Sequence, residues 1–330
     1  MTCRFAYRRY RLPFKAPVRT AHGPWTTREG VLLRLEAEDG KIGWGEAAPV
    51  PGFGTETVDE IEAACRSLGE RLESDSKIAG PTCFRNALAA AQEYLHEESG
   101  KPSEALPVAA LLPAGHAALA AVVPRLEAGF RTFKWKVGVG DQGDEMALLD
   151  DLSAKLPEGA RLRLDANGAW DRRRAERWLE ICADRPVEFV EQPAPRGNDD
   201  LLRGLAADFP TPIALDESLA GDGDIARWLD SGWPGVFVVK PALIAEVAGA
   251  LARLSAARSA VVFSSALETA VGARAALRSA FAWAGPPRAL GFGVWPLFAD
   301  ARFDGPSAAP FLRWEDVRRI DPEAAWNAAN

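Results

Sequence analysis

Five charged residues each stand at the end of a short apolar run in the central part of the chain. They are Lys136, Asp165, Glu191, Asp216 and Lys240, and they follow one another at intervals of 29, 26, 25 and 24 residues. Each interval has the length of about one strand, one helix and two short loops. Because an unpaired charge is costly to bury, a charge that recurs where buried strands should end indicates a common chemical function.

Three of these residues are carboxylates, namely Asp165, Glu191 and Asp216. If they end neighbouring parallel strands, their side chains converge, and mutual repulsion favours their protonation unless a cation lies among them. Three carboxylate oxygens that leave positions free for water or substrate suit Mg²⁺, with Mn²⁺ as a second choice. No histidine or cysteine belongs to the set, which disfavours Zn²⁺. The alternative is that each carboxylate pairs with a lysine or an arginine.

The two lysines, Lys136 and Lys240, flank the carboxylates in the sequence, so a closed ring of strands would place them on opposite sides of the metal. A lysine that is partly buried beside a cation has a lowered pKa and can serve as a base. This arrangement suits removal of a proton next to a carboxylate that the metal holds. Alternatively, Lys136 lies along an apolar surface with its ammonium in water, and Lys240 forms an ordinary salt bridge.

The segment that must position these groups shows alternating strand and helix patterns. An apolar run at 106–112 precedes an alanine-rich helix that ends near Gly129, and a last run near 289–292 supplies an eighth strand. This rhythm predicts an α/β fold, a TIM-type (β/α)7β barrel or its (β/α)8 variant, in which the strand ends face one centre. The patterns between these runs lie at 132–137, 145–155, 161–165, 171–183, 187–191, 199–208, 212–216, 222–230, 235–239, 243–257 and 260–264, followed by a helix across 267–284.

The first hundred residues predict a separate antiparallel α+β unit. Strands are expected at 4–8, 30–37 and 42–46, with a polar loop at about 16–29. A helix should begin at Thr57, where Glu60 completes a capping box. A second helix fits about 83–97. The apolar face of the first helix is formed by Val58, Ile61, Cys65, Leu68 and Leu72.

The expected organisation is an α+β capping domain at 1–100, the barrel at 101–300, and an irregular C-terminal segment at 301–330 that packs back on the capping domain. Two loops of the capping domain, near His22 and Phe53, would close over the strand ends.

Composition excludes several classes of function. The chain has 330 residues, a net charge of −7 and no basic block, which argues against a nucleic-acid surface. No apolar stretch is long enough to span a membrane, and arginines interrupt the N-terminus where a signal peptide would need an apolar core. The four cysteines are widely spaced, which favours free thiols in a reducing cytoplasm. A small carboxylate is the expected partner, and the oligomeric state stays open.

Five short motifs together resemble the enolase superfamily, in its muconate-lactonising subgroup. The resemblance covers essentially the whole chain and agrees in order and spacing. It implies that Asp165, Glu191 and Asp216 bind Mg²⁺. The motifs are Lys134-x-Lys136, Asp165-Ala166-Asn167, Glu191-Gln192-Pro193, Asp216-Glu217-Ser218 and Lys240-Pro241.

The same resemblance implies roles for the lysines. Lys136 would remove the α-proton of the substrate and return a proton to a departing hydroxide. Lys240 would stay protonated and stabilise the enediolate from the opposite face. Lys134 would lower the pKa of Lys136 through its like charge.

Weaker candidates surround these groups. Asn167 and Glu217 would support the metal ligands. Arg163, one pleat below Asp165, is a candidate for orienting the Lys136 ammonium or the substrate. Ser265, at a strand end, is a candidate for lining the pocket for the substrate's side chain.

Within the subgroup, five further stretches are most similar to a dehydratase of menaquinone biosynthesis. An N-acylamino-acid racemase would use the same two lysines and stays open, as does a catalytically silent barrel that only binds ligands. The run 291–295 lacks the Asp-x-Asp with which dipeptide epimerases hold a substrate ammonium, which argues against dipeptides. The five stretches are Thr27–Gly30, Gly43–Glu46, Pro51–Thr57, Arg161–Asn167 and Ser264–Thr269.

Overall fold

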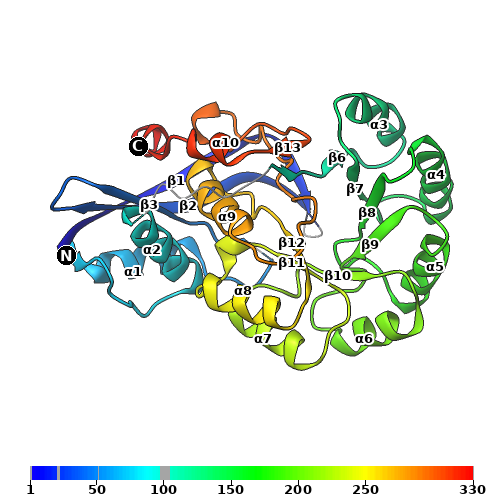
Figure 1. Ribbon diagram of the computed structural model, residues 1–330, viewed down its shortest axis with the longest axis horizontal. Coiled ribbons are helices and arrows are strands. Elements are labelled where there is room, and N and C mark those ends of the chain that lie inside the picture. The colour runs from blue at the N-terminus through cyan, green and yellow to red at the C-terminus, as the bar shows by residue number, and fades with distance from the viewer. Residues whose placement is uncertain (1, 21–22, 51, 97–104, 330) are drawn as a thin grey trace.

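The computed structural model describes residues 2–20, 23–50, 52–96 and 105–329. Figure 1 shows two sheets side by side: an antiparallel sheet from the N-terminal residues, and a curled parallel sheet with helices along its outer side. The C-terminal segment lies next to the antiparallel sheet. His22, in one of the predicted closing loops, lies outside the described residues.

The antiparallel sheet has the strand order β3-β2-β1-β4. Its strands are β1 (Thr2–Thr20), β2 (Gly23–Ala37), β3 (Ile42–Ala47) and β4 (Arg71–Glu73). The polar loop predicted at 16–29 is wrong, because β1 and β2 stay paired as far as Thr20 and Gly23, apart from an irregularity between Pro13 and Val18. Hydrogen bonds between the two backbones hold β1 and β2 together and do not depend on side-chain polarity, so the strands continue through these polar residues.

Two helices pack on this sheet, α1 (Val58–Leu68) and α2 (Thr82–Leu95). The predicted capping box at Thr57 is confirmed: the Glu60 carboxylate accepts from the Thr57 backbone at 2.7 Å, and the Thr57 hydroxyl accepts from the Glu60 backbone at 3.2 Å. Leu72 was wrongly assigned to this helix. Gly69, with φ of 77°, ends the helix, and Leu72 continues into β4.

The larger sheet contains seven parallel strands in the order β12-β11-β10-β9-β8-β7-β6. This confirms the α/β class and the alternating rhythm, and helices follow the strands along the outside (Figure 1). The strands are β6 (Ala110–Leu112), β7 (Thr132–Lys136), β8 (Arg161–Asp165), β9 (Val187–Glu191), β10 (Ile213–Leu215), β11 (Val236–Val239) and β12 (Ala260–Phe263). The helices are α3 (Ala117–Glu127), α4 (Gln142–Lys155), α5 (Arg172–Cys182), α6 (Asp199–Asp208), α7 (Asp222–Asp230), α8 (Val247–Ala256) and α9 (Ala270–Phe281), with a 3₁₀ turn, η1 (Pro241–Leu243), before α8.

The run predicted as an eighth strand touches both edges of this sheet. Leu290 forms a parallel bridge with Val108, and Gly291 forms one with Ser264. The Ala109 backbone donates to Leu290 at 2.9 Å, and the Gly291 backbone donates to Phe263 at 2.7 Å. These are isolated bridges, so this run is shorter than a full strand.

Side-chain alternation divides the parallel sheet into an outer and an inner face. The outer face packs against the helices in one large apolar cluster that includes Trp135, Leu164 and Phe237. The inner face carries a smaller cluster of Phe189, Ala214, Val236, Val238 and Val262. Toward the carboxyl ends of the strands, the inner positions change from apolar to charged residues.

The prediction that the C-terminal segment is irregular is wrong. It contains η2 (Ala301–Phe303), β13 (Phe311–Leu312), α10 (Trp314–Arg318) and α11 (Pro322–Ala328), and β13 pairs with β5 (Leu106–Pro107). Trp326 packs against Trp44 of β3, with ring centroids 5.6 Å apart, and its carbonyl accepts a hydrogen bond from Arg8 at 2.5 Å. The division at residues 1–100, 101–300 and 301–330 itself stays a prediction.

The four cysteines lie in the interior of the protein. Cys3, Cys65, Cys83 and Cys182 are buried free thiols. None of the described helices is both long and apolar enough to cross a membrane.

Candidate functional site

The five charged residues at the strand ends lie on one edge of the parallel sheet. Lys136 pairs in register with Asp165, and Asp165 with Glu191. Asp216 directly follows β10, and Lys240 directly follows β11. Strand polarity therefore brings together groups that are about a hundred residues apart in the sequence.

This edge opens on a cavity of about 680 Å³. The N-terminal residues Trp25, Val50 and Phe53 form part of its wall. The predicted site residues that line it are Lys134, Lys136, Asp165, Asn167, Asp216, Glu217, Lys240 and Ser265. Glu191 is buried just behind this lining and contacts Lys134.

Two ammonium groups lie among the carboxylates. Lys134 Nζ is 2.9 Å from Asp165 Oδ2 and 2.6 Å from Glu191 Oε1. Lys240 Nζ forms an ion pair with Asp216 Oδ1. Among the described residues, no three acidic, histidine or cysteine side chains stand close enough together to hold a metal ion as they lie. Each of the three strand-end carboxylates is instead paired with a lysine ammonium.

The environment shifts the pKa values of Lys134 and Lys240 in opposite directions. Burial lowers the pKa of Lys240 to about 7, although the nearby Glu191 carboxylate favours the charged form. Burial also acts to lower the pKa of Lys134, but attraction to Asp165 and Glu191 outweighs it and raises that pKa above its usual range. Lys134 is therefore held as a cation between two carboxylates.

The carboxylates also differ from one another. Burial opposes ionisation of Asp165, but the ammonium of Lys134 outweighs it and lowers its pKa. Burial raises the pKa of Glu191. Burial, together with repulsion from Asp165 and Glu191, raises the pKa of Glu217 to about 7. Negative charge is thus in excess at this edge, and an added cation would relieve it.

Asn167 joins two of the predicted residues. Its backbone donates to Asp165 Oδ1 at 3.1 Å, and its side-chain amide donates to Glu217 Oε1 at 3.1 Å. It has φ of 45°, a left-handed conformation that asparagine tolerates better than most residues. Asn167 therefore joins a strand-end carboxylate to Glu217 of the following strand end.

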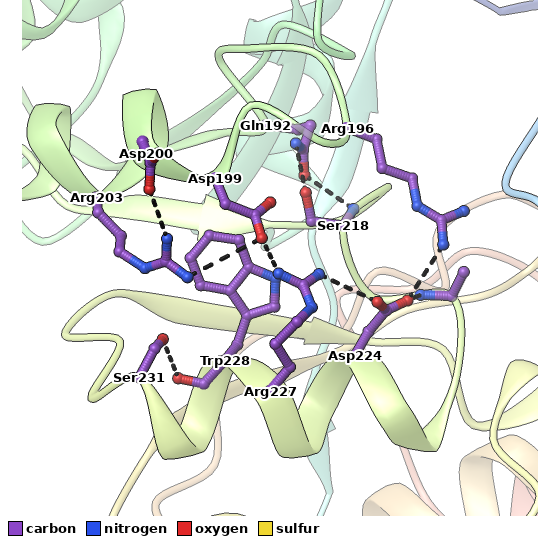
Figure 2. A network of polar contacts seen from close by, with 11 residues as sticks. Gln192, Arg196, Asp199, Asp200, Arg203, Ser218, Asp224, Arg227, Trp228 and Ser231 are labelled. Atoms are coloured by element: carbon purple, nitrogen blue, oxygen red, sulfur yellow. Dashed lines mark hydrogen bonds and ion pairs between the residues drawn. The ribbon is translucent and has the colours of Figure 1, made fainter.

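Sequence reasoning gave no role to Gln192, which proves to organise the next strand end. Its Oε1 accepts from the backbone of Asp216 at 3.0 Å and of Ser218 at 3.2 Å. Its Nε2 donates to Ser218 Oγ and to the Ala194 carbonyl, both at 2.9 Å. Figure 2 shows Gln192 against Ser218. A buried amide beside Glu191 thus fixes the backbone that carries Asp216, and its place in the Glu191-Gln192-Pro193 motif was the available signal.

A second polar network lies farther along the same loops (Figure 2). Asp224 accepts from Arg196 at 3.4 Å, from Arg227 at 3.1 Å and from the Ala220 backbone at 3.0 Å. Trp228 has the guanidinium carbons of Arg203 and Arg227 within 4.9 and 5.1 Å of its ring centroid. These contacts fasten α7 to the loop that follows β9.

Two of the weaker candidates have different outcomes. Arg163 does not line the cavity: its Nε donates to Glu188 at 2.7 Å and its Nη1 to the Ala289 carbonyl at 2.6 Å, deeper inside the sheet. These hydrogen bonds tie Arg163 to the interior of the sheet, and its predicted role in orienting Lys136 or the substrate stays a prediction. Ser265 lines the cavity, and its hydroxyl also donates to Glu268 at 3.0 Å.

Of the two predicted closing loops, the one that contains Phe53 reaches Lys240. The Lys240 ammonium lies 4.8 Å from the centroid of the Phe53 ring, within the range of a cation–π contact. This loop therefore covers the edge of the cavity beside Lys240.

Comparison with known families assigns both parts of the chain. Residues 117–308 match the model of the enolase C-terminal domain-like family. Residues 3–83 match the model of the MenC N-terminal domain.

Individual relatives agree with these matches. An o-succinylbenzoate synthase of Thermosynechococcus vestitus is 41% identical over 302 residues, which cover 88% of this chain and 92% of the relative. The solved structure of the o-succinylbenzoate synthase from Thermosynechococcus elongatus BP-1, complexed with Mg in its active site, superposes with a TM-score of 0.84 at 37% identity, covering 98% of this chain and 99% of the other. A hydrophobic dipeptide epimerase of Roseobacter litoralis is 31% identical over 241 residues, covering 65% of this chain and 69% of the relative.

Proposed function

Because this chain belongs to the enolase superfamily, we propose that it is an o-succinylbenzoate synthase. It dehydrates 2-succinyl-6-hydroxy-2,4-cyclohexadiene-1-carboxylate to 2-succinylbenzoate, a hydro-lyase step of menaquinone biosynthesis. The observation that carries this proposal is the pairing of a MenC-type N-terminal region with a cavity lined by Lys136, Lys240 and strand-end carboxylates. The 41% identity to a synthase over 92% of its length supports it.

We infer that the curled sheet is a closed (β/α)7β barrel capped by the N-terminal region. Closure is supported by the bridges from Leu290 to Val108 and from Gly291 to Ser264, which join the two sheet edges. The capping role is supported by Trp25, Val50 and Phe53 in the cavity wall.

Asp165, Glu191 and Asp216 would hold Mg²⁺, or Mn²⁺ in its place. The donor set fits a hard divalent cation, because it is made of carboxylates with no histidine or cysteine. One buried oxygen beside this set, Glu217 Oε2, accepts no hydrogen bond within the described structure, whereas Asp216 Oδ1 is paired with the Lys240 ammonium. When bound, the metal supplies positive charge that offsets the charge developing on the substrate carboxylate.

Lys136 transfers the proton, and the other two lysines stabilise charge. Lys136 Nζ takes the proton from the ring carbon that bears the carboxylate, and the electron pair of that C–H bond stays on the substrate. The C–O bond to the ring hydroxyl then breaks, and the departing hydroxide takes the proton from Lys136 to leave as water. Lys240 as an ammonium, paired with Asp216, faces the developing negative charge from the other side, and Lys134 stays charged between Asp165 and Glu191.

An N-acylamino-acid racemase is the second candidate, because two lysines on opposite faces also suit inversion at an α-carbon. The identity of 31% to a dipeptide epimerase is the reason to include racemase activity in the test. The chain lacks an Asp-x-Asp motif in residues 291–295, which disfavours dipeptides themselves.

The test is a direct assay of the purified protein with the cyclohexadiene carboxylate. The absorbance of the aromatic product reports the progress of the reaction. We expect turnover that EDTA abolishes and Mg²⁺ restores. A parallel incubation of an N-succinyl amino acid in D₂O reports racemase chemistry. Turnover indifferent to chelation would reject the metal site, and rapid exchange with inversion without dehydration would replace the synthase by the racemase.

The proposed partner is the small carboxylate substrate alone, and the proposed location is the cytoplasm. Net charge of −7 without a basic block supports the absence of nucleic acid from this list.

A further inference from the structure

Arg28 of β2 is fully buried, although arginine is rarely so. Its guanidinium reaches across to the parallel sheet. Nε donates to the Leu267 carbonyl at 2.9 Å, and Nη2 donates to the Ala266 carbonyl at 3.3 Å. These carbonyls belong to the turn between β12 and α9.

The same guanidinium also binds the loop that follows β3. Nη2 donates to the Ala48 carbonyl at 2.7 Å, and Nη1 donates to the Pro49 carbonyl at 2.5 Å. A third contact runs along its own strand, where the guanidinium carbon lies 5.1 Å from the centroid of the Trp25 ring.

Each of these three segments supplies a wall of the cavity. Trp25 lines it from β2, Val50 and Phe53 line it from the loop after β3, and Ala266 and Leu267 line it from the turn after β12. One buried side chain therefore stands behind three walls that come from both parts of the chain.

The turn at Leu267 needs such support. Leu267 has φ of 60°, a left-handed conformation that is strained for a branched apolar residue. Inside the turn, its backbone donates to Ser265 Oγ at 2.9 Å. Its outward carbonyl and that of Ala266 are the groups that Arg28 binds.

We propose that Arg28 is a positioning residue that fixes these three walls relative to one another and so sets the fit of the substrate's side chain. Arginine is required because its planar guanidinium carries five N–H donors in a fixed fork, whereas a lysine ammonium carries three on a flexible stem. All five hydrogen bonds described for Arg28 go to backbone carbonyls, so it holds main chain in place. The part of the proposal that concerns substrate rests on the proposed function.

The first arm of the test measures backbone order without any substrate. Arg28→Lys is compared with Arg34→Lys, a matched control on the same strand, whose guanidinium pairs with Glu36 at 2.7 Å and lies over Trp44. We expect hydrogen–deuterium exchange to rise about tenfold in peptides with Ala48–Val50 and in those with Ala266–Leu267, a loss of about 1.4 kcal/mol. Arg34→Lys should change neither.

The second arm measures KM and kcat separately. For Arg28→Lys we expect KM to rise about tenfold while kcat changes less than about threefold, because the walls bind substrate and the lysines perform the chemistry. Binding of 2-succinylbenzoate in the presence of Mg²⁺ should weaken in parallel. A fall in kcat with KM unchanged, or exchange that rises over the whole protein or at neither segment, would overturn the proposal.

The two proposals fail in different ways. If the wild-type protein neither dehydrates the cyclohexadiene carboxylate nor binds the product, the proposed function fails, and the exchange arm alone still decides whether Arg28 fixes the walls. If Arg28→Lys does not fold, Arg28→Gln, which keeps an amide donor, replaces it. If neither folds while Arg34→Lys does, Arg28 has a purely structural role and the proposal is rejected.

Discussion

The interior of the parallel sheet carries buried charge at both of its ends, and the two ends differ. At the carboxyl ends of the strands, Lys134 contacts Asp165 and Glu191 at 2.9 and 2.6 Å. Deeper in the sheet, Glu188 lies between Arg163 and Arg288, at 2.7 and 2.6 Å. The distances alone would not tell these clusters apart.

The balance of charge and the surroundings do distinguish them. Burial opposes ionisation of Glu188, but its two arginines outweigh it and lower its pKa. Burial raises the pKa of Glu191, which has carboxylate neighbours as well as a lysine. Arg163 stacks on Phe189 beneath the cavity, whereas Lys134 lines it. A carboxylate that is held ionised by two arginines away from the cavity stabilises the fold, and carboxylates that outnumber their cations and face a cavity are available for chemistry.

The largest effect that this comparison implies is loss of turnover at the cavity end. We expect Lys136→Met to lower kcat at least about a thousandfold, because it removes the proposed base, with little change in the unfolding temperature. Lys155→Met, at an exposed position on α4, is the matched control and should keep both values. Turnover within tenfold of wild type would reject Lys136 as the base and leave the two ends of the sheet functionally alike.

Much of the cavity end was predictable because strand periodicity alone fixes it. Once strands end at Asp165 and Glu191, parallel pairing brings the two residues together without knowledge of the loops. The capping box at Thr57 was equally local. Such features depend on short stretches of sequence, where the spacing of residue types carries the information.

The missed features depend on contacts between distant segments. Arg28 and Glu46 stood in recognised motifs without a role, because the partners that join them to the parallel sheet lie more than two hundred residues away: Glu46 accepts from the backbone of Thr269 at 2.9 Å and of Gly272 at 2.8 Å. The partner of Arg163, Glu188, was not predicted, because it lies at an irregularity in the β8–β9 pairing. No local pattern reports either relation.

The next effect concerns stability at the Glu188 cluster, away from the cavity. Glu188→Gln leaves Arg163 buried without its carboxylate, so we expect the free energy of unfolding to fall by about 3–5 kcal/mol. Because Glu188 does not line the cavity, kcat per folded molecule should stay within about threefold of wild type. Urea denaturation and active-site-normalised kinetics measure the two quantities, with exposed Glu180→Gln as control. A stable variant with greatly reduced kcat would show that this cluster takes part in the reaction.

The smallest effect tests a carboxyl group that is buried near the cavity but outside it. Burial raises the pKa of Glu268 to about 7, and repulsion from Glu46 of β3 also raises it. The hydrogen bond that the carboxylate accepts from Ser265 at 3.0 Å acts to lower the pKa but does not outweigh them. The Lys240 ammonium, directly after β11, interacts electrostatically with this carboxylate. Unlike Glu188, this group has no arginine partner described, so its charge should cost stability.

The sign follows from the two pKa values. The folded pKa of about 7 lies above the unfolded value of about 4.5, so the folded state holds the proton more tightly, and the resulting stability is complete below pH 4.5 and lost as the pH rises through 7. Glu268→Gln removes this titration. The variant should match wild type near pH 4.5 and exceed it by up to about 3 kcal/mol above pH 7, as measured by urea denaturation at each pH. Exposed Glu158→Gln should show no such trend. A difference between wild type and Glu268→Gln that does not vary with pH would mean that Glu268 stays charged in the folded protein, as Glu188 does, and that an enclosed position without an arginine is enough to hold a carboxylate.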